Sequence, residues 1–155
     1  MSFKANHKQY LDTLLQYYEE EVSGESYFYG LADHFDHRDE LILLAKVERH
    51  AARTIQPLLA KYGLLPRSES ILAKEGMEDV ARHTLMKWQE FVSYMVDRYP
   101  KYLDDFAALE DMAPAEDLRL LRKLTAHEVA AIEFANSEAS GDTNSVLPLQ
   151  RYLAS

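Results

Sequence analysis

The chain has 155 residues and no cysteine, and its 26 acidic and 17 basic side chains give a formal net charge of −9. This length fits a single domain, residues 1–155, with an ordinary hydrophobic core. The acidic charge disfavours nucleic-acid binding, which needs clustered basic side chains, and the missing cysteines exclude disulfides and thiolate metal sites.

The sequence also lacks the features that direct a protein into or across a membrane. No run approaches the roughly 20 apolar residues of a membrane-spanning helix. The first residues, MSFKANHK, contain no apolar core of the signal-peptide type. We therefore expect a cytoplasmic protein without a membrane partner.

Helical periodicity covers almost the whole chain and predicts an all-α fold. Four long helices are expected, at about residues 6–35, 37–62, 77–109 and 114–140, with a short helical tail in 141–155. The third helix is expected to carry an apolar stripe that includes Leu85, Trp88, Val92, Met95 and Tyr99. Pro57 and Pro100 predict kinks, because proline does not fit a helix interior. The connection before the third helix is long and the other two are tight, which predicts a hairpin, a crossover and a second hairpin.

Glutamates fall on the core-facing side of three of these helices. At about 100° per residue, Glu21 and Glu25 lie within the apolar arc of the first helix. The same count puts Glu48 within the arc of the second helix and Glu128 within that of the fourth, with His127 close to its edge. A buried carboxylate is costly unless a cation, a proton or a metal compensates it. The core is therefore expected to hold a cluster of acids.

Helix register predicts which of these acids meet. With the first turn centred near residues 36 and 37, Glu25 should lie level with Glu48 and face it. The third helix offers no inward acid at the level of Glu128. The basic side chains considered for the core all point outward (Lys46, Arg53, Arg119 and Arg122). Converging carboxylates without a basic partner raise one another's pKa, and a divalent metal with a preference for oxygen ligands, such as Fe, Mn or Mg, resolves that conflict.

Three segments resemble the ferritin-like superfamily, most of all its rubrerythrin-like branch. They read SGESY at residues 23–27, VERHAAR at 47–53 and LTAHEVAAIEFA at 124–135. The resemblance implies a ferritin-like four-helix bundle. It also implies a di-metal centre built from one glutamate on each of two helices and Glu-x-x-His on each of the other two.

The chain keeps only part of that ligand set. Glu25, Glu48 and Glu128 stand at the family's glutamate positions, whereas Ala51 and Ala131 stand where the two histidines are expected. The third helix has no inward glutamate either. The resemblance therefore implies an incomplete metal site.

Two interpretations of function follow. The first is a metal-carboxylate oxidoreductase that uses Fe or Mn, handles O₂ or peroxide and forms a homodimer. His127, one residue before Glu128, and Glu21, one turn before Glu25, then substitute for missing ligands, so the candidate set is Glu25, Glu48, Glu128, His127 and Glu21. No catalytic residue is assigned. The second is a non-enzymatic bundle whose site has decayed, with a structural, stress or partner-binding role, in which tyrosine hydroxyls hydrogen-bond to the acids (Tyr18, Tyr27, Tyr29 and Tyr99).

Overall fold

The structure is a computed structural model that describes the backbone of residues 3–155 and the side chains from residue 6 onward. All regular structure in these residues is helical. The elements are α1 (Phe3–Ala32), α2 (Arg38–Tyr62), α3 (Glu69–Val80), α4 (Trp88–Arg98), η1 (Tyr99–Lys101), α5 (Tyr102–Met112), η2 (Ala115–Asp117), α6 (Leu118–Ala139) and α7 (Leu147–Leu153). No helix in the described part of the chain combines the length and the apolar character needed to cross a membrane.

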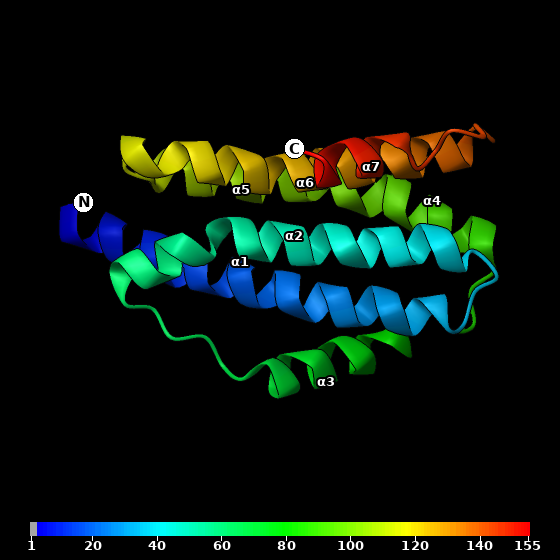
Figure 1. The fold of residues 1–155 in the computed structure, drawn as a ribbon, viewed down its shortest axis with the longest axis horizontal. Helices are drawn as coiled ribbons and strands as arrows, with labels where there is room; N and C mark the ends of the chain where they lie inside the picture. The colour runs from blue at the N-terminus through cyan, green and yellow to red at the C-terminus, as the bar shows by residue number, and fades with distance from the viewer. Residues whose placement is uncertain (1–2) are drawn as a thin grey trace.

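Four long helical segments lie side by side, namely α1, α2, the rod formed by α4, η1 and α5, and α6 (Figure 1). α1 and α2 form one antiparallel hairpin, and α6 runs back along α5 and α4 to form the second. The residues between Tyr62 and Trp88, which include α3, return along the outside of α1 and join the two hairpins. α7 packs on α2 and α6. The chain therefore follows the expected order of hairpin, crossover and hairpin.

Periodicity alone starts the third long helix at about residue 77, and this boundary is wrong. Residues 77–80 end α3, and α4 begins only at Trp88. A capping box fixes this start, because the Glu90 carboxylate accepts a hydrogen bond from the Lys87 N–H at 3.0 Å. Leu85, which periodicity places on the apolar stripe, precedes the helix and is 98% exposed.

The two prolines behave differently. α2 continues through Pro57 without interruption, so the kink expected there is not a break in the helix. At Pro100 the rod changes to the 3₁₀ turn η1 between α4 and α5, which agrees with the expected irregularity. Gly63 ends α2 with a φ of 65°, a left-handed conformation that glycine adopts without strain.

The hydrophobic core consists of two clusters arranged along the length of the helices. The first lies near the turn between α1 and α2 and includes Leu31, Leu44, Phe91 and Phe134. The second lies toward the N-terminal end of α1 and includes Tyr10, Leu14, Ile55 and Leu121. On α2 one cluster gives way to the other between Val47 and Ala51, and on α6 this happens between Leu124 and Ala130. The polar candidates on both helices fall in these intervals, so the two clusters enclose them from either end.

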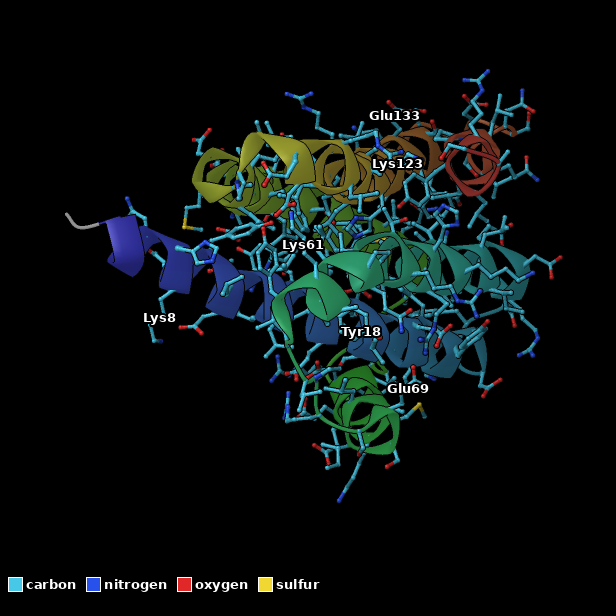
Figure 2. The ribbon with its side chains drawn as sticks, turned by 60° about the vertical axis from the view of Figure 1, so that its left-hand side comes forward. Lys8, Tyr18, Lys61, Glu69, Lys123 and Glu133 are labelled. Carbon is cyan, nitrogen blue, oxygen red and sulfur yellow. The ribbon has the colours of Figure 1, made fainter. Side chains whose placement is uncertain are left out.

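A buried carboxylate, Asp117, ties the N-terminal end of the molecule together. Its Oδ2 accepts hydrogen bonds from the hydroxyls of Tyr10 at 2.8 Å and Tyr62 at 2.5 Å, and its Oδ1 accepts one from Lys61 Nζ at 2.6 Å. Figure 2 shows Lys61 at the end of α2, on the side that faces the start of α6. Burial acts to raise the pKa of Asp117, but these hydrogen bonds outweigh it and hold the pKa below its ordinary value.

We expect Asp117→Asn to lower the free energy of unfolding at neutral pH by about 2 kcal/mol, because the buried network loses its charge. A carboxyl whose pKa is lower in the folded state stabilises the fold above its unfolded pKa of about 4, and this contribution is lost as the pH falls through the folded pKa. The difference between wild type and variant should therefore shrink in acid when both are measured by urea denaturation. The matched control is Glu116→Gln, which neutralises an exposed carboxylate 3.6 Å from Lys61 and should change stability little. An undiminished difference in acid would contradict this account.

α3 is fixed on α1 by an unusually close helix contact. A Cβ atom added at Gly76 would lie 2.2 Å from the backbone oxygen of Ser23, so no larger residue fits there. The hydroxyls of Ser23 and Ser26 donate hydrogen bonds across the same contact to the backbone oxygens of Leu72 at 3.0 Å and Ala73 at 2.8 Å. The crossover is therefore held as a rigid cover on α1.

We expect Gly76→Ala to destabilise the protein by about 1–3 kcal/mol in urea denaturation, because α3 must move away from the α1 backbone. Helix propensity alone predicts the opposite, a gain of about 1 kcal/mol. Glu78→Ala, at an exposed position of the same helix, is the control and should have little effect. A stabilised Gly76→Ala variant would show that the contact does not constrain α3.

Candidate metal centre

Three polar side chains from three different helices converge in the interval between the two clusters. They are Glu21 from α1, Glu48 from α2 and His127 from α6, and one ligand atom of each lies within 4.8 Å of the others. His127 Nε2 is 2.9 Å from Glu21 Oε2 and 3.4 Å from Glu48 Oε2. Glu21 is 5% exposed and His127 is 2% exposed. The group therefore lies inside the molecule, where water compensates charge poorly.

His127 is oriented by its own helix. Its Nδ1 contacts the backbone oxygen of Leu124, one turn earlier in α6, so this nitrogen carries a proton. The ring also packs edge-on against Phe106, with 5.5 Å between the ring centroids. Nε2 is thereby directed at the two glutamates, which is the arrangement that fixes the tautomer of metal-binding histidines.

The electrostatics of this group are unbalanced. Among residues 6–155, Glu21 and Glu48 form ion pairs only with His127. Glu21 Oε2 is buried and makes no hydrogen bond in the described structure, even though His127 Nε2 is so close. Burial, together with the negative charge of Glu21, raises the pKa of Glu48 well above its ordinary value. Burial acts to lower the pKa of His127, but Glu21 and Glu48 outweigh it and raise that pKa well above its ordinary value.

Glu128 lies at the edge of the same group. Its Oε2 is 3.9 Å from His127 Nε2, and its Oε1 is buried without a hydrogen-bond partner in the described residues. Burial raises the pKa of Glu128 to about 7. It is therefore close enough to join the site after a small movement, but it is not one of the three converging ligands.

Glu25 is not part of the group, which corrects the expectation that it faces Glu48. Arg49 forms a two-pronged ion pair with it, from Nη2 to Oε1 at 2.8 Å and from Nε to Oε2 at 3.1 Å. Arg49 also donates to Glu69 at 2.7 Å, at the start of α3. The hairpin register is nearly as predicted, since the Glu48 carboxylate lies against Gly24, the neighbour of Glu25. The Glu25 side chain, however, meets Arg49 and not Glu48. Glu25 thus has a basic partner in Arg49, which is not among the cations expected to point outward.

Gly24 makes room for the Glu48 carboxylate. A Cβ atom at position 24 would lie 3.0 Å from Glu48 Cδ and 3.1 Å from its Oε1. A side chain at this position would push the carboxylate away from His127. The sequence alone does not reveal this role of Gly24, because its contact with Glu48 forms only when α1 and α2 pack together.

The tyrosine hydroxyls expected to satisfy the acids do not do so. In the described structure, no hydrogen bond joins Glu21, Glu48 or Glu128 to any of Tyr18, Tyr27, Tyr29 and Tyr99. Tyr99 is buried near the group, and this burial raises the pKa of its hydroxyl well above the ordinary value. The rod of α4, η1 and α5 therefore contributes aromatic side chains to the site, and none of its acids is among the three converging ligands.

A cavity of about 550 Å³ adjoins the converging ligands. It lies between α1, the end of α3 and the rod of α4, η1 and α5, and all three converging side chains line it. Its other lining residues are charged and aromatic, and the aromatic ones include Tyr27, Tyr94, Tyr99, Tyr102 and Phe106. This volume is typical of small-molecule sites. A ligand in the cavity would reach the three side chains directly.

The donor set and its spacing fit a divalent ion. Two ligands at right angles on bonds of about 2.1 Å lie about 3.0 Å apart, and the nitrogen–oxygen separations here are 2.9 and 3.4 Å. Two carboxylates also balance the charge of one divalent ion. Comparison of the chain with family models, with curated proteins and with solved structures found no match. The geometry is therefore the basis for any functional conclusion.

We expect Gly24→Ala to lower Mn²⁺ affinity by at least about tenfold, because the added methyl displaces a ligand without removing it. The measurement is isothermal titration calorimetry on metal-free protein. Urea denaturation of the metal-free variant is the control and should show a fold at least as stable as wild type, since alanine favours helix. Unchanged affinity in a folded variant would mean that Glu48 is not a ligand.

Proposed function

We propose that this protein is a ferritin-like four-helix bundle with a single-metal carboxylate centre, in which Glu21, Glu48 and His127 bind Fe²⁺ or Mn²⁺. The observation that carries the proposal is the convergence of the three side chains together with the buried Glu21 Oε2, which accepts no hydrogen bond in the described residues and has only His127 beside it. A buried carboxylate oxygen without a hydrogen bond is costly, and a metal ion at this point would satisfy it.

The ferritin-like part of the proposal is supported by connectivity and by the position of the site. The chain forms two hairpins joined by a long crossover, and the acids lie midway along the helices. The site differs from the family's di-metal pattern because Ala51 and Ala131 occupy the histidine positions and are buried as part of the apolar core. Glu21 takes the place expected for Glu25, and His127 supplies an imidazole from one position before Glu128. One ion, rather than two, suits this ligand set.

The chemistry that we propose is oxidation with O₂ or peroxide at the metal. Bound Fe or Mn would supply redox activity, and three protein ligands would leave positions free on the side of the cavity. Leu124 and Phe106 keep His127 in place. The aromatic wall around Tyr99 would keep water away from the reacting molecule. A homodimer and a cytoplasmic location remain predictions.

A metal-free role is the second candidate, and one observation favours it. With its pKa raised, His127 can carry a positive charge at neutral pH and so partly balance Glu21 and Glu48 by itself. The bundle would then be a structural or partner-binding protein with a decayed site. The two candidates differ in whether the purified protein retains a metal.

We expect protein produced in medium supplemented with iron and manganese to contain about one metal ion per chain, measured by elemental analysis. Glu21→Gln and His127→Gln should each lower Mn²⁺ affinity by at least about 100-fold, because each removes a ligand. Glu25→Gln is the matched control and should bind as wild type does, since Glu25 pairs with Arg49. Loss of peroxide catalysed by the loaded wild type, and not by Glu21→Gln, would support the oxidoreductase assignment.

Two outcomes would contradict this proposal. If wild-type protein stays metal-free after anaerobic incubation with Fe²⁺ and Mn²⁺, the metal-free role is correct. If Glu25→Gln loses metal as completely as Glu21→Gln, the ligand set is wrong. Circular dichroism on each variant separates lost binding from lost folding.

A further inference from the structure

The cavity beside the three ligands carries an excess of negative charge. Eight carboxylates and three guanidinium groups line it. Of the three arginines, Arg67 pairs with Glu19 and Glu75, and Arg82 lies 3.5 Å from Asp79. The third, Arg98, is exposed and donates from Nε to the Tyr102 hydroxyl at 3.3 Å. The basic groups are thus engaged near the surface, whereas Glu20 and Asp105 are exposed at the mouth and Glu128 is buried inside.

One divalent ion would balance only part of this charge. Its two positive charges would offset Glu21 and Glu48, and carboxylates at Glu20, Asp105 and Glu128 would still line the cavity. Glu20 accepts a hydrogen bond from Gln16 at 3.0 Å, which supplies no charge. None of the three forms an ion pair with a lysine or arginine in the described residues. Glu20 and Asp105 are exposed at the mouth, where they would attract a second cation, and Glu128 is buried further in.

The aromatic side chains of the cavity favour an organic cation over a small inorganic ion. Tyr94 and Tyr99 have ring centroids 6.5 Å apart, and Tyr99 and Tyr102 have centroids 6.1 Å apart. Tyr27 and Phe106 also line the cavity. The faces of such rings attract ammonium groups and exclude water from them.

Two buried polar atoms in the lining lack hydrogen-bond partners. His83 is 7% exposed and its Nδ1 makes no hydrogen bond in the described structure, and the same holds for Oε1 of Glu128, which is 8% exposed. Both residues line the cavity. Burial lowers the pKa of His83, so its ring is neutral and one of its two nitrogens can accept a hydrogen bond. A buried acceptor without a donor is rare in folded proteins, and an N–H group of a ligand would satisfy it.

We propose that this cavity binds an organic ammonium ion, a molecule with a protonated amine on an apolar body, next to the metal. Carboxylates at the mouth attract the charge, the tyrosine faces hold it, and the apolar body fills the remaining volume. The ligand's role as a substrate rests on the function proposed above, whereas its binding needs no metal.

Three probes that share one ring and differ in charge test this inference, namely benzylammonium, benzyl alcohol and benzoate. Each is titrated by calorimetry at constant ionic strength into metal-free and Mn²⁺-loaded protein. We expect the ammonium probe to bind one molecule per chain, at least about tenfold tighter than either other probe. Equal binding of all three, or preference for benzoate, would overturn the inference.

A pair of double variants tests whether the cavity carboxylates are responsible. Glu20→Gln with Asp105→Asn should weaken the ammonium probe by about tenfold, because both charges line the cavity. Asp111→Asn with Glu133→Gln makes the same change of net charge at exposed positions outside it, and Figure 2 shows Glu133 on the outer face of α6. This control should bind as wild type does, and equal weakening in both double variants would refute a specific site.

The same titrations distinguish the two proposals of function and ligand. Protein that binds the ammonium probe but retains no metal would refute the metal centre and leave the cation site standing. Protein that loads one metal ion but does not prefer the ammonium probe would refute the cation site alone.

Discussion

The convergence of buried Glu21 and His127 with the partly buried Glu48, between two apolar clusters, is the constraint on which the rest of the structure depends. Glu21, Glu48 and His127 come from three helices, so each helix must hold its register for the side chains to meet. Leu124 orients the histidine, and Gly24 leaves space for the Glu48 carboxylate. The apolar clusters at either end limit the access of water and so make an unbalanced charge costly.

A second buried carboxylate in the same molecule shows what a satisfied site looks like. Asp117 is 1% exposed, yet Tyr10, Tyr62 and Lys61 supply it with three donors. Its pKa is lowered, as expected for a carboxylate that the fold stabilises in its charged form. Glu48 and Glu128 have raised pKa values, and Glu128 keeps an oxygen without a partner. This contrast between a stabilising network and an incomplete one favours a ligand at the second site.

The architecture also explains why the site is reachable. α3 lies against α1 at Gly76, so the crossover covers the outer side of the first hairpin. The space between α1 and the rod of α4, η1 and α5 is left to the cavity, which extends to all three ligands. Acidic residues at its mouth and aromatic residues in its lining give the cavity a chemical character of its own, separate from that of the three candidate metal ligands. An open cavity of about 550 Å³ is suited to a small ligand.

The sequence by itself determined the helical class, the order of hairpins and the helices that carry the acids, because these depend on periodicity and on local signals such as Gly63 and Pro100. It also identified Glu21, Glu48, Glu128 and His127 as core candidates. Only the tertiary structure decided between Glu21 and Glu25, since both lie on the same arc of α1 and one turn apart. Packing gave Glu25 an arginine partner on the neighbouring helix and left Glu21 with a histidine that is distant in sequence. A helical wheel gives the face of a single helix, whereas a ligand set depends on how three helices meet.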